Sequence, residues 1–180
     1  MLPHDATDSP LLARLRAGEQ AALQTLFTRH YRPLCDFACQ LTKSPDLAEE
    51  VVADIFLILW QKRRELEIHT SLRAYLYVAV RRRALQVVKK EHVWDGLDES
   101  VEHAATEPFN PLDVLLFREL NYRIDHLVDR LPDPDRLMLR LKMSGLTYKE
   151  IAETLELSVK TVEYRLAKSI ERVKRGYQQK

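Results

Sequence analysis

Apolar side chains recur every three or four residues through nearly all of this sequence, whereas strict alternation of apolar and polar residues is almost absent. The first spacing gathers side chains on one face of a helix, and the second would be expected of half-buried strands. Only four glycines occur among 180 residues, and tight β-hairpins depend on residues that tolerate positive φ. The pattern therefore predicts an all-α fold, and an apolar fraction of 46% is sufficient for packed cores.

Three long helices are expected in the first half of the chain, at residues 19–42, 45–64 and 71–90. Ser44 is the expected N-cap of the second of these helices, and Pro45 suits its first position. Amphipathic helices joined by short connections bury their apolar faces against one another in a compact bundle. We therefore predict a first small helical domain over residues 1–91.

The character of the sequence changes between Glu91 and Asp113, where acidic residues recur and neither lysine nor arginine occurs. Gly96, Pro108 and Pro111 lie in the same stretch and disfavour a regular element. We predict an acidic flexible linker at residues 92–113, and a plain solvated tether is as good an interpretation as any specific role. Helical spacing then resumes at residues 116–131 and 134–143, which predicts a second small helical domain over residues 114–180.

The segment from residue 146 to 175 has the pattern of a helix-turn-helix. Thr147 and Glu150 have capping-box spacing, and Ser158 is a natural N-cap for the second helix. Glu156 stands in the turn where glycine is frequent, so a left-handed conformation there would be strained. The outer face of the second helix is polar and mostly cationic and suits a DNA major groove: its candidate DNA-binding residues are Lys160, Thr161, Tyr164, Arg165 and Lys168. A helix pair that only packs is the alternative.

The predicted helix at residues 71–90 interleaves aromatic and basic residues on one side. Such a face suits single-stranded DNA, because cations follow the phosphates while rings stack on exposed bases. The candidates are Tyr75, Tyr77, Arg81, Arg82, Gln86 and Lys89. Tyr77 lies at the edge of this face, and a place in the core is the alternative for it.

An acidic face is predicted on the helix at residues 45–64, where Asp46, Glu50 and Asp54 recur every four residues away from the apolar stripe. Like charges at this spacing cost a little in an isolated helix. The face is either solvated or a docking surface for a basic protein partner.

Cys35 and Cys39 are the only cysteines, and we interpret them as two reduced, partly buried thiols. A metal site that includes His30 is the less favoured interpretation. The first ten residues do not read as a secretory signal, and the longest apolar run, Ile55 to Trp60, is far shorter than the ~20 residues of a membrane span. We therefore expect a cytoplasmic protein without direct membrane insertion.

The sequence contains no phosphate-binding glycine loop, metal cluster or nucleophile–base constellation, so we expect no enzymatic activity, cofactor or metal. Three other classes remain open: a regulator that binds duplex DNA alone, an interaction protein, and an enzyme acting on nucleic acid. A stand-alone regulator would leave the N-terminal domain unexplained. An interaction protein would not need the cationic recognition helix, and an enzyme would need a carboxylate or metal site that the sequence does not offer.

Taken together, these segments resemble the extracytoplasmic-function (ECF) sigma factors of the sigma-70 family. Residues 26–63, LFTRHYRPLCDFACQLTKSPDLAEEVVADIFLILWQKR, resemble regions 2.1–2.2 of that family. SLRAYLYVAVRRRALQVVKK resembles regions 2.3–2.4, and the segment from Arg130 to Lys174 resembles region 4. The order and spacing match over residues 18–176. The turn and recognition helix are similar to those of the FecI-like subgroup.

The resemblance implies a factor that directs core RNA polymerase to promoters and initiates transcription. Asp46, Glu50 and Asp54 would face the polymerase clamp, and the C-terminal domain would dock on the flap. Arg63 and the loop after it, with the 71–90 helix, would open and capture the −10 strand, and the recognition helix would read the −35 element. An anti-sigma factor is an expected partner, and the free protein is expected to be a monomer.

Two departures from the family pattern affect details of this assignment. Arg82 stands where the family usually has asparagine, and Ala53 stands where glutamine is common. They leave the −10 base preference and part of the clamp contact undetermined.

Overall fold

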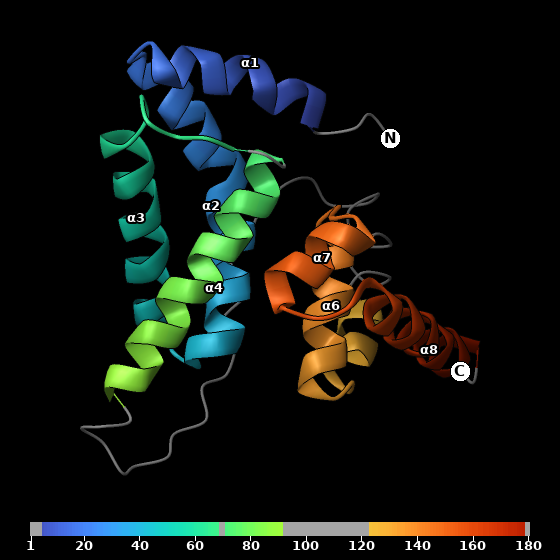
Figure 1. Cartoon of the computed structure of the whole chain (residues 1–180). Helices are drawn as coiled ribbons and strands as arrows, with labels where there is room; N and C mark the ends of the chain where they lie inside the picture. The colour runs from blue at the N-terminus through green and yellow to red at the C-terminus, as the bar shows by residue number, and fades with distance from the viewer. Residues whose placement is uncertain (1–4, 69–70, 92–122, 179–180) are drawn as a thin grey trace, which may run out of the picture.

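The computed structural model describes residues 5–68, 71–91 and 123–178, and within these ranges it contains helices and no strand (Figure 1). The predicted all-α fold is therefore confirmed. The predicted linker at residues 92–113 lies outside the described residues, as does the first part of the helix expected at 116–131. Residues 123–129 of that helix are described and are helical.

The N-terminal half forms a bundle of four helices. They are α1 (Asp5–Arg16), α2 (Gln20–Thr42), α3 (Pro45–Gln61) and α4 (Leu72–Glu91). The helices α2, α3 and α4 pack on one another, and α1 crosses the end of α2 (Figure 1). Their shared core is fully buried and consists of one apolar stripe from each helix, including Leu26, Leu34, Val52, Leu59 and Leu76. Ser44 caps α3 as predicted, since its hydroxyl accepts a hydrogen bond from the Leu47 amide.

Helix α1 was not predicted from the sequence, because it contains Pro10 and its N-terminal turn lacks an apolar stripe. It is held in place by Asp8, which is only 2% exposed and contacts Arg29 and His30 of α2. The Nε2 atom of His30 lies 3.0 Å from Asp8 Oδ2. Burial by itself raises the pKa of Asp8, but the bonds and charges of His30 and Arg29 outweigh it, so the pKa is lowered. The anchor of α1 is therefore a buried ionic cluster that only the tertiary structure assembles.

The C-terminal half contains α6 (Asp133–Met143), α7 (Tyr148–Leu155) and α8 (Val159–Gln178), which pack together around Ile151, Val162 and Leu166. Both bonds of the predicted capping box are present at the start of α7. The Thr147 amide donates to Glu150 at 2.8 Å, and the Glu150 amide donates to the Thr147 hydroxyl at 3.3 Å.

Helix α8 begins at the predicted N-cap, where the Ser158 hydroxyl accepts from the Thr161 amide at 3.1 Å. With α7 it forms the expected helix-turn-helix. No helix in the described part of the chain combines the length and the apolar character that a bilayer span requires.

The turn between α7 and α8 is strained where the sequence predicts it. Glu156 has φ 57° and ψ 44°, in the left-handed region that residues with a Cβ enter at a cost of ~1–2 kcal/mol. Its amide donates to carbonyls of the last turn of α7, which is how a left-handed C-cap closes a helix. Glycine would make the same closure without the steric cost.

We expect Glu156→Gly to raise the free energy of unfolding of the C-terminal half by about 1 kcal/mol, because it relieves the left-handed strain and is only partly offset by greater chain entropy. Urea titration followed by circular dichroism measures the change. Glu156→Gln is the control, because it removes the charge but keeps the Cβ, and it should not stabilise. Equal midpoints for the glycine and glutamine variants would mean that the turn is unstrained.

Candidate nucleic-acid interface

The recognition helix α8 separates its apolar and cationic side chains cleanly. Val162, Leu166 and Ser169 are buried against α6 and α7. Tyr164 lies at the opposite pole and is 69% exposed. Lys160 and Lys168, one turn to either side of Tyr164, are also exposed. The predicted outer face is thus present over the first half of α8, beginning at its capped N-terminus.

Thr161 and Arg165 occupy one flank of this outer face and are only partly exposed. The Thr161 hydroxyl lies 2.8 Å from that of Ser158, within the N-terminal cap. Arg165 turns back toward α6, where its Nε donates to Asp135 Oδ1 at 2.7 Å. The Asp135 side chain is 13% exposed, so this ion pair joins the recognition helix to its scaffold. The guanidinium of Arg165 is therefore engaged within the fold, unlike the amines of Lys160 and Lys168.

Helix α4 presents a second polar face, and its members differ in exposure. Arg82, Gln86 and Lys89 are exposed along one side of the helix. Tyr75 is half-buried, and burial raises the pKa of its hydroxyl. Four of the residues predicted to bind DNA on this helix thus reach solvent: Tyr75, Arg82, Gln86 and Lys89.

Tyr77 lies in the core of the N-terminal bundle, as its alternative interpretation held. It is 3% exposed, and its ring meets Phe37 edge to face with 5.0 Å between centroids. Burial raises the pKa of its hydroxyl, although a hydrogen bond with Ser144 opposes the shift. In this structure the Tyr77 ring is therefore unavailable for stacking on a base.

Arg63 follows the end of α3 and lies over Trp60, with its guanidinium carbon 4.2 Å from the ring centroid. Its Nη1 donates to the Trp60 carbonyl at 2.8 Å, while its Nε is buried with no protein partner. The segment that follows is tied to α1, since Arg16 Nη2 donates to the Leu66 carbonyl at 2.7 Å. Sequence reasoning missed this role of α1.

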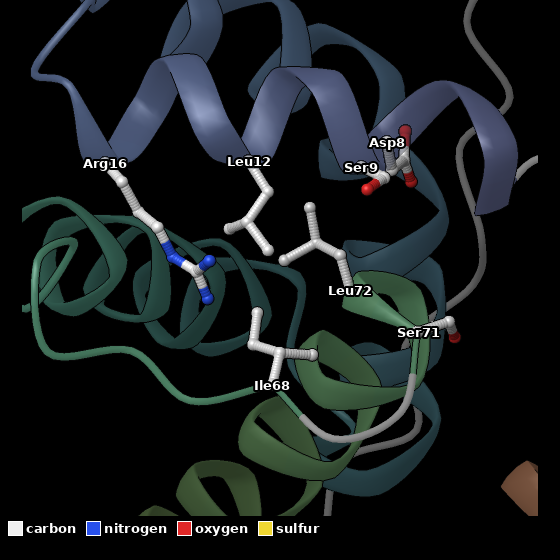
Figure 2. Close-up of a pocket in the computed structure, with 7 residues that line it drawn as sticks. All are labelled: Asp8, Ser9, Leu12, Arg16, Ile68, Ser71 and Leu72. Atoms are coloured by element: carbon white, nitrogen blue, oxygen red, sulfur yellow. The ribbon is translucent and has the colours of Figure 1, made fainter.

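A hollow opens between α1 and the residues that precede α4 (Figure 2). Leu12, Ile68 and Leu72 point toward one another across it, with Arg16 at one end and Asp8 at the other. Helix α1 therefore forms one wall of a cavity beside the segment that was predicted to act on the −10 strand.

On the predicted acidic face of α3, Asp46 and Glu50 are exposed, whereas Asp54 forms an ion pair. Arg83 of α4 donates to Asp54 Oδ2 through Nη2 at 2.7 Å and through Nε at 3.2 Å. Sequence reasoning missed this pair, because a run of three arginines does not reveal which one points at α3. Leu57, one turn further along α3, is 54% exposed and extends the acidic face with an apolar side chain.

The two cysteines of α2 are free and partly buried. Burial raises the pKa of Cys35 to about 11 and also raises that of Cys39, which agrees with two protonated, partly buried thiols. His30 instead contacts Asp8. Among the described residues, no three histidine, cysteine or acidic side chains gather as metal ligands would.

Two family models match the chain. The model described as Sigma-70 region 2 matches residues 26–92, and the model described as Sigma-70, region 4 matches residues 122–173. The ECF RNA polymerase sigma-E factor of Escherichia coli (strain K12) is 24% identical over 181 residues, covering 93% of this chain and 92% of that protein. The ECF RNA polymerase sigma factor SigK of Mycobacterium sp. (strain JLS) is 26% identical and covers 96% of this chain and 92% of that protein.

Two solved structures share the fold. A structure of CnrH in complex with the cytosolic domain of CnrY matches with a TM-score of 0.60 at 21% identity, covering 96% of this chain and 97% of that one. The sigma factor RpoE in complex with the anti-sigma factor NepR, from Bartonella quintana, matches with a TM-score of 0.63 at 19% identity. That match covers 86% of this chain and 96% of the other.

The Arg165–Asp135 pair leads to a prediction that distinguishes a structural role of Arg165 from a role in DNA binding. Arg165→Ala leaves a largely buried carboxylate without its partner, so we expect the free energy of unfolding to fall by about 1–3 kcal/mol. Urea denaturation of the purified variant measures this loss. Lys168→Ala, on the exposed face of the same helix, is the matched control and should leave the unfolding midpoint unchanged. A stable Arg165→Ala protein that fails only in DNA binding would make Arg165 a reader.

Proposed function

The chain belongs to the extracytoplasmic-function group of the sigma-70 family, and we propose from this that it directs core RNA polymerase to a set of promoters and initiates transcription there. One structural observation carries the proposal to the level of residues. Capped helix α8 exposes Lys160, Tyr164 and Lys168 in one line while its buried side chains fix it to α6 and α7. A rigid cationic helix of this kind fits a major groove.

In this proposal the −35 element is read by Lys160, Thr161, Tyr164 and Lys168, and Arg165 acts chiefly as a positioning residue through Asp135. Phosphate contacts from the lysines would supply affinity, and base-edge contacts would supply specificity. Strand capture at the −10 element would fall to Arg63, Tyr75, Arg81, Arg82, Gln86 and Lys89. The buried position of Tyr77 favours a supporting role for it beneath this face.

Docking on the polymerase clamp would use the exposed carboxylates of Asp46 and Glu50 beside Leu57. Acidic side chains at the rim of an interface steer association with a basic partner. An exposed apolar side chain at its centre adds apolar area that is buried on binding. Asp54 would contribute while paired with Arg83, so its carboxylate is already oriented before the polymerase arrives. The C-terminal domain would bind the flap.

We further propose that the protein works in the cytoplasm as an initiation factor rather than as an enzyme, and that an anti-sigma factor restrains it. The structural relative RpoE is in complex with an anti-sigma factor, which supports this partner class. Membership of the FecI-like subgroup and a monomeric free state stay predictions from the sequence.

Run-off transcription tests the proposal directly. Purified core polymerase is supplied with DNA from upstream of this chain's own gene, with and without the protein. We expect transcripts from a discrete start only when the protein is present, because core enzyme alone does not select promoters. Binding of duplex DNA without polymerase, together with no transcript, would instead indicate a stand-alone regulator.

A paired substitution tests the assignment of the −35 reader. Lys160→Ala combined with Lys168→Ala should reduce specific transcription at least tenfold and lower the salt dependence of promoter binding by about one unit of slope per lysine. Run-off assays over a range of salt concentrations measure both effects, and polymerase binding should not change. Lys174→Ala, an exposed lysine further along α8, is the matched control. An equal loss in the control would mean that general charge, not this face, is responsible.

A further inference from the structure

Helix α1 supports the segment that joins α3 to α4, although it lies outside the family match. The match to Sigma-70 region 2 begins at residue 26, whereas α1 ends at Arg16. The described part of the joining segment, residues 62–68, includes Arg63 of the proposed −10 surface. A role for α1 therefore has to be argued from its own contacts.

Arg16, the last residue of α1, holds the backbone of the joining segment. Its Nη2 donates to the Leu66 carbonyl at 2.7 Å. The Leu66 side chain is only 9% exposed and packs in the core of the bundle. A carbonyl outside a helix needs a partner from a side chain or from water. Leu66 is thus fixed twice, by its buried side chain and by a guanidinium from α1.

The turn that follows α1 lies close to the same segment. Gly18 has φ +87°, and a Cβ there would lie 3.8 Å from Arg63 Nε. The Arg63 guanidinium lies over the Trp60 ring, and its Nη1 donates to the Trp60 carbonyl. The end of α1 and its turn therefore approach the joining segment at two points, Arg63 and Leu66.

Helix α1 is itself fixed to the bundle, so it can act as a rigid support. Leu15 is completely buried in the core, and Asp8 forms the buried ionic cluster with α2. Leu12 points toward Ile68 and Leu72 across the hollow in Figure 2, so α1 also faces the far end of the segment. The support runs from α2 through α1 to the backbone between α3 and α4.

The segment exposes charged side chains while its backbone is held in this way. Arg64 and Glu65 are exposed, on either side of the partly buried Arg63 and the buried Leu66. Binding residues on a loop need a scaffold that fixes their positions, because a displacement of about 1 Å weakens a site. A hydrogen bond from a charged donor changes an equilibrium constant by about tenfold or more. The bond from Arg16 is therefore strong enough to determine which shape the segment adopts.

We propose that Arg16 is a positioning residue for capture of the −10 strand, because its bond to the Leu66 carbonyl holds the joining segment in the shape that receives the strand. This inference rests on the proposed function, since it adds a support to the −10 surface described there. Arg16 acts through the backbone of the segment and not on DNA. Its loss therefore slows promoter opening and leaves the first, duplex complex with the promoter intact.

The test compares Arg16→Ala with wild type, each bound to core polymerase, on the promoter mapped by run-off transcription. The fluorescence of 2-aminopurine placed in the −10 element rises as its base leaves the stack and gives the rate of opening. Fluorescence anisotropy at low temperature gives the affinity of the duplex complex. We expect Arg16→Ala to open the promoter about tenfold more slowly with unchanged affinity. Arg16→Lys should recover part of the rate, because an ammonium also donates to a carbonyl.

Arg14→Ala is the matched control, because Arg14 is an exposed arginine of the same helix that pairs with Glu19 at 2.8 Å. It should open the promoter at the wild-type rate. Salt dependence separates positioning from DNA contact. Loss of a phosphate contact lowers the salt slope of promoter binding by about one unit, whereas loss of a positioning residue leaves it unchanged. A lower slope for Arg16→Ala, or opening at the wild-type rate, would overturn the proposal.

Hydrogen exchange of the free full-length protein tests the support without polymerase. Faster exchange in Arg16→Ala that is confined to residues 62–68 would support the proposal, because it reports local opening of the joining segment. Unchanged exchange there would overturn it. Faster exchange throughout α1 would attribute slow opening to loss of the helix and would overturn it as well. Failure of the wild-type protein to support run-off transcription would count against the proposed function, whereas exchange tests the role of Arg16 independently of it.

Discussion

Helices α4 and α8 must each satisfy two opposite requirements. One side of the helix has to be buried in a core, while the other side keeps several cationic side chains exposed to water. Most of the stability of a helix in a protein comes from packing of its apolar face, so the position of α8 depends on burying Val162 and Leu166 against α6 and α7. That burial also fixes the rotation of the helix, and the rotation decides which basic residues reach solvent. Helix α4 meets the same demand by burying Leu76 and Val80 while it exposes Arg82 and Gln86. The cores thus determine the geometry of the interfaces.

Ion pairs within the fold then divide the remaining charges into those that hold the scaffold and those that are free for a partner. Arg83 is paired with Asp54, and Arg165 with Asp135. In both cases the carboxylate is partly withdrawn from water, where leaving it unpaired would be costly. An arginine in such a pair orients a helix, and part of its guanidinium is already engaged by a carboxylate. Counting basic residues on a helical wheel therefore overestimates the DNA-binding surface.

The sequence predicts those parts of the structure that depend on local interactions. The capping box at Thr147 and the N-cap at Ser158 involve residues three positions apart, and both were predicted correctly. The strain at Glu156 was also predictable, because a turn of this kind needs a positive φ whatever surrounds it. Helix α1 was not, since it depends on Asp8 meeting side chains of α2 that lie more than twenty positions away.

The exposure of residues at the border between two helical faces could not be predicted either. Tyr77 and Arg165 both lie at such borders, where a small rotation of the helix moves a side chain from solvent to core. Tertiary packing turns Tyr77 toward Phe37 and Arg165 toward Asp135. The helical pattern alone leaves Tyr77 open between the outer face and the core, and it assigns Arg165 to DNA.

The two halves of the chain contact each other mainly through α4 and α7. The Glu156 side chain is 66% exposed, so its pair with Arg81 is screened by water and contributes little by itself. The Ser71–Glu150 and Arg73–Ser144 hydrogen bonds are more sheltered, and they lie beside a hydrophobic core that continues from one half into the other. Ser71 and Glu150 also cap the beginnings of α4 and α7, so one pair of polar groups serves both the helix ends and the contact between the halves.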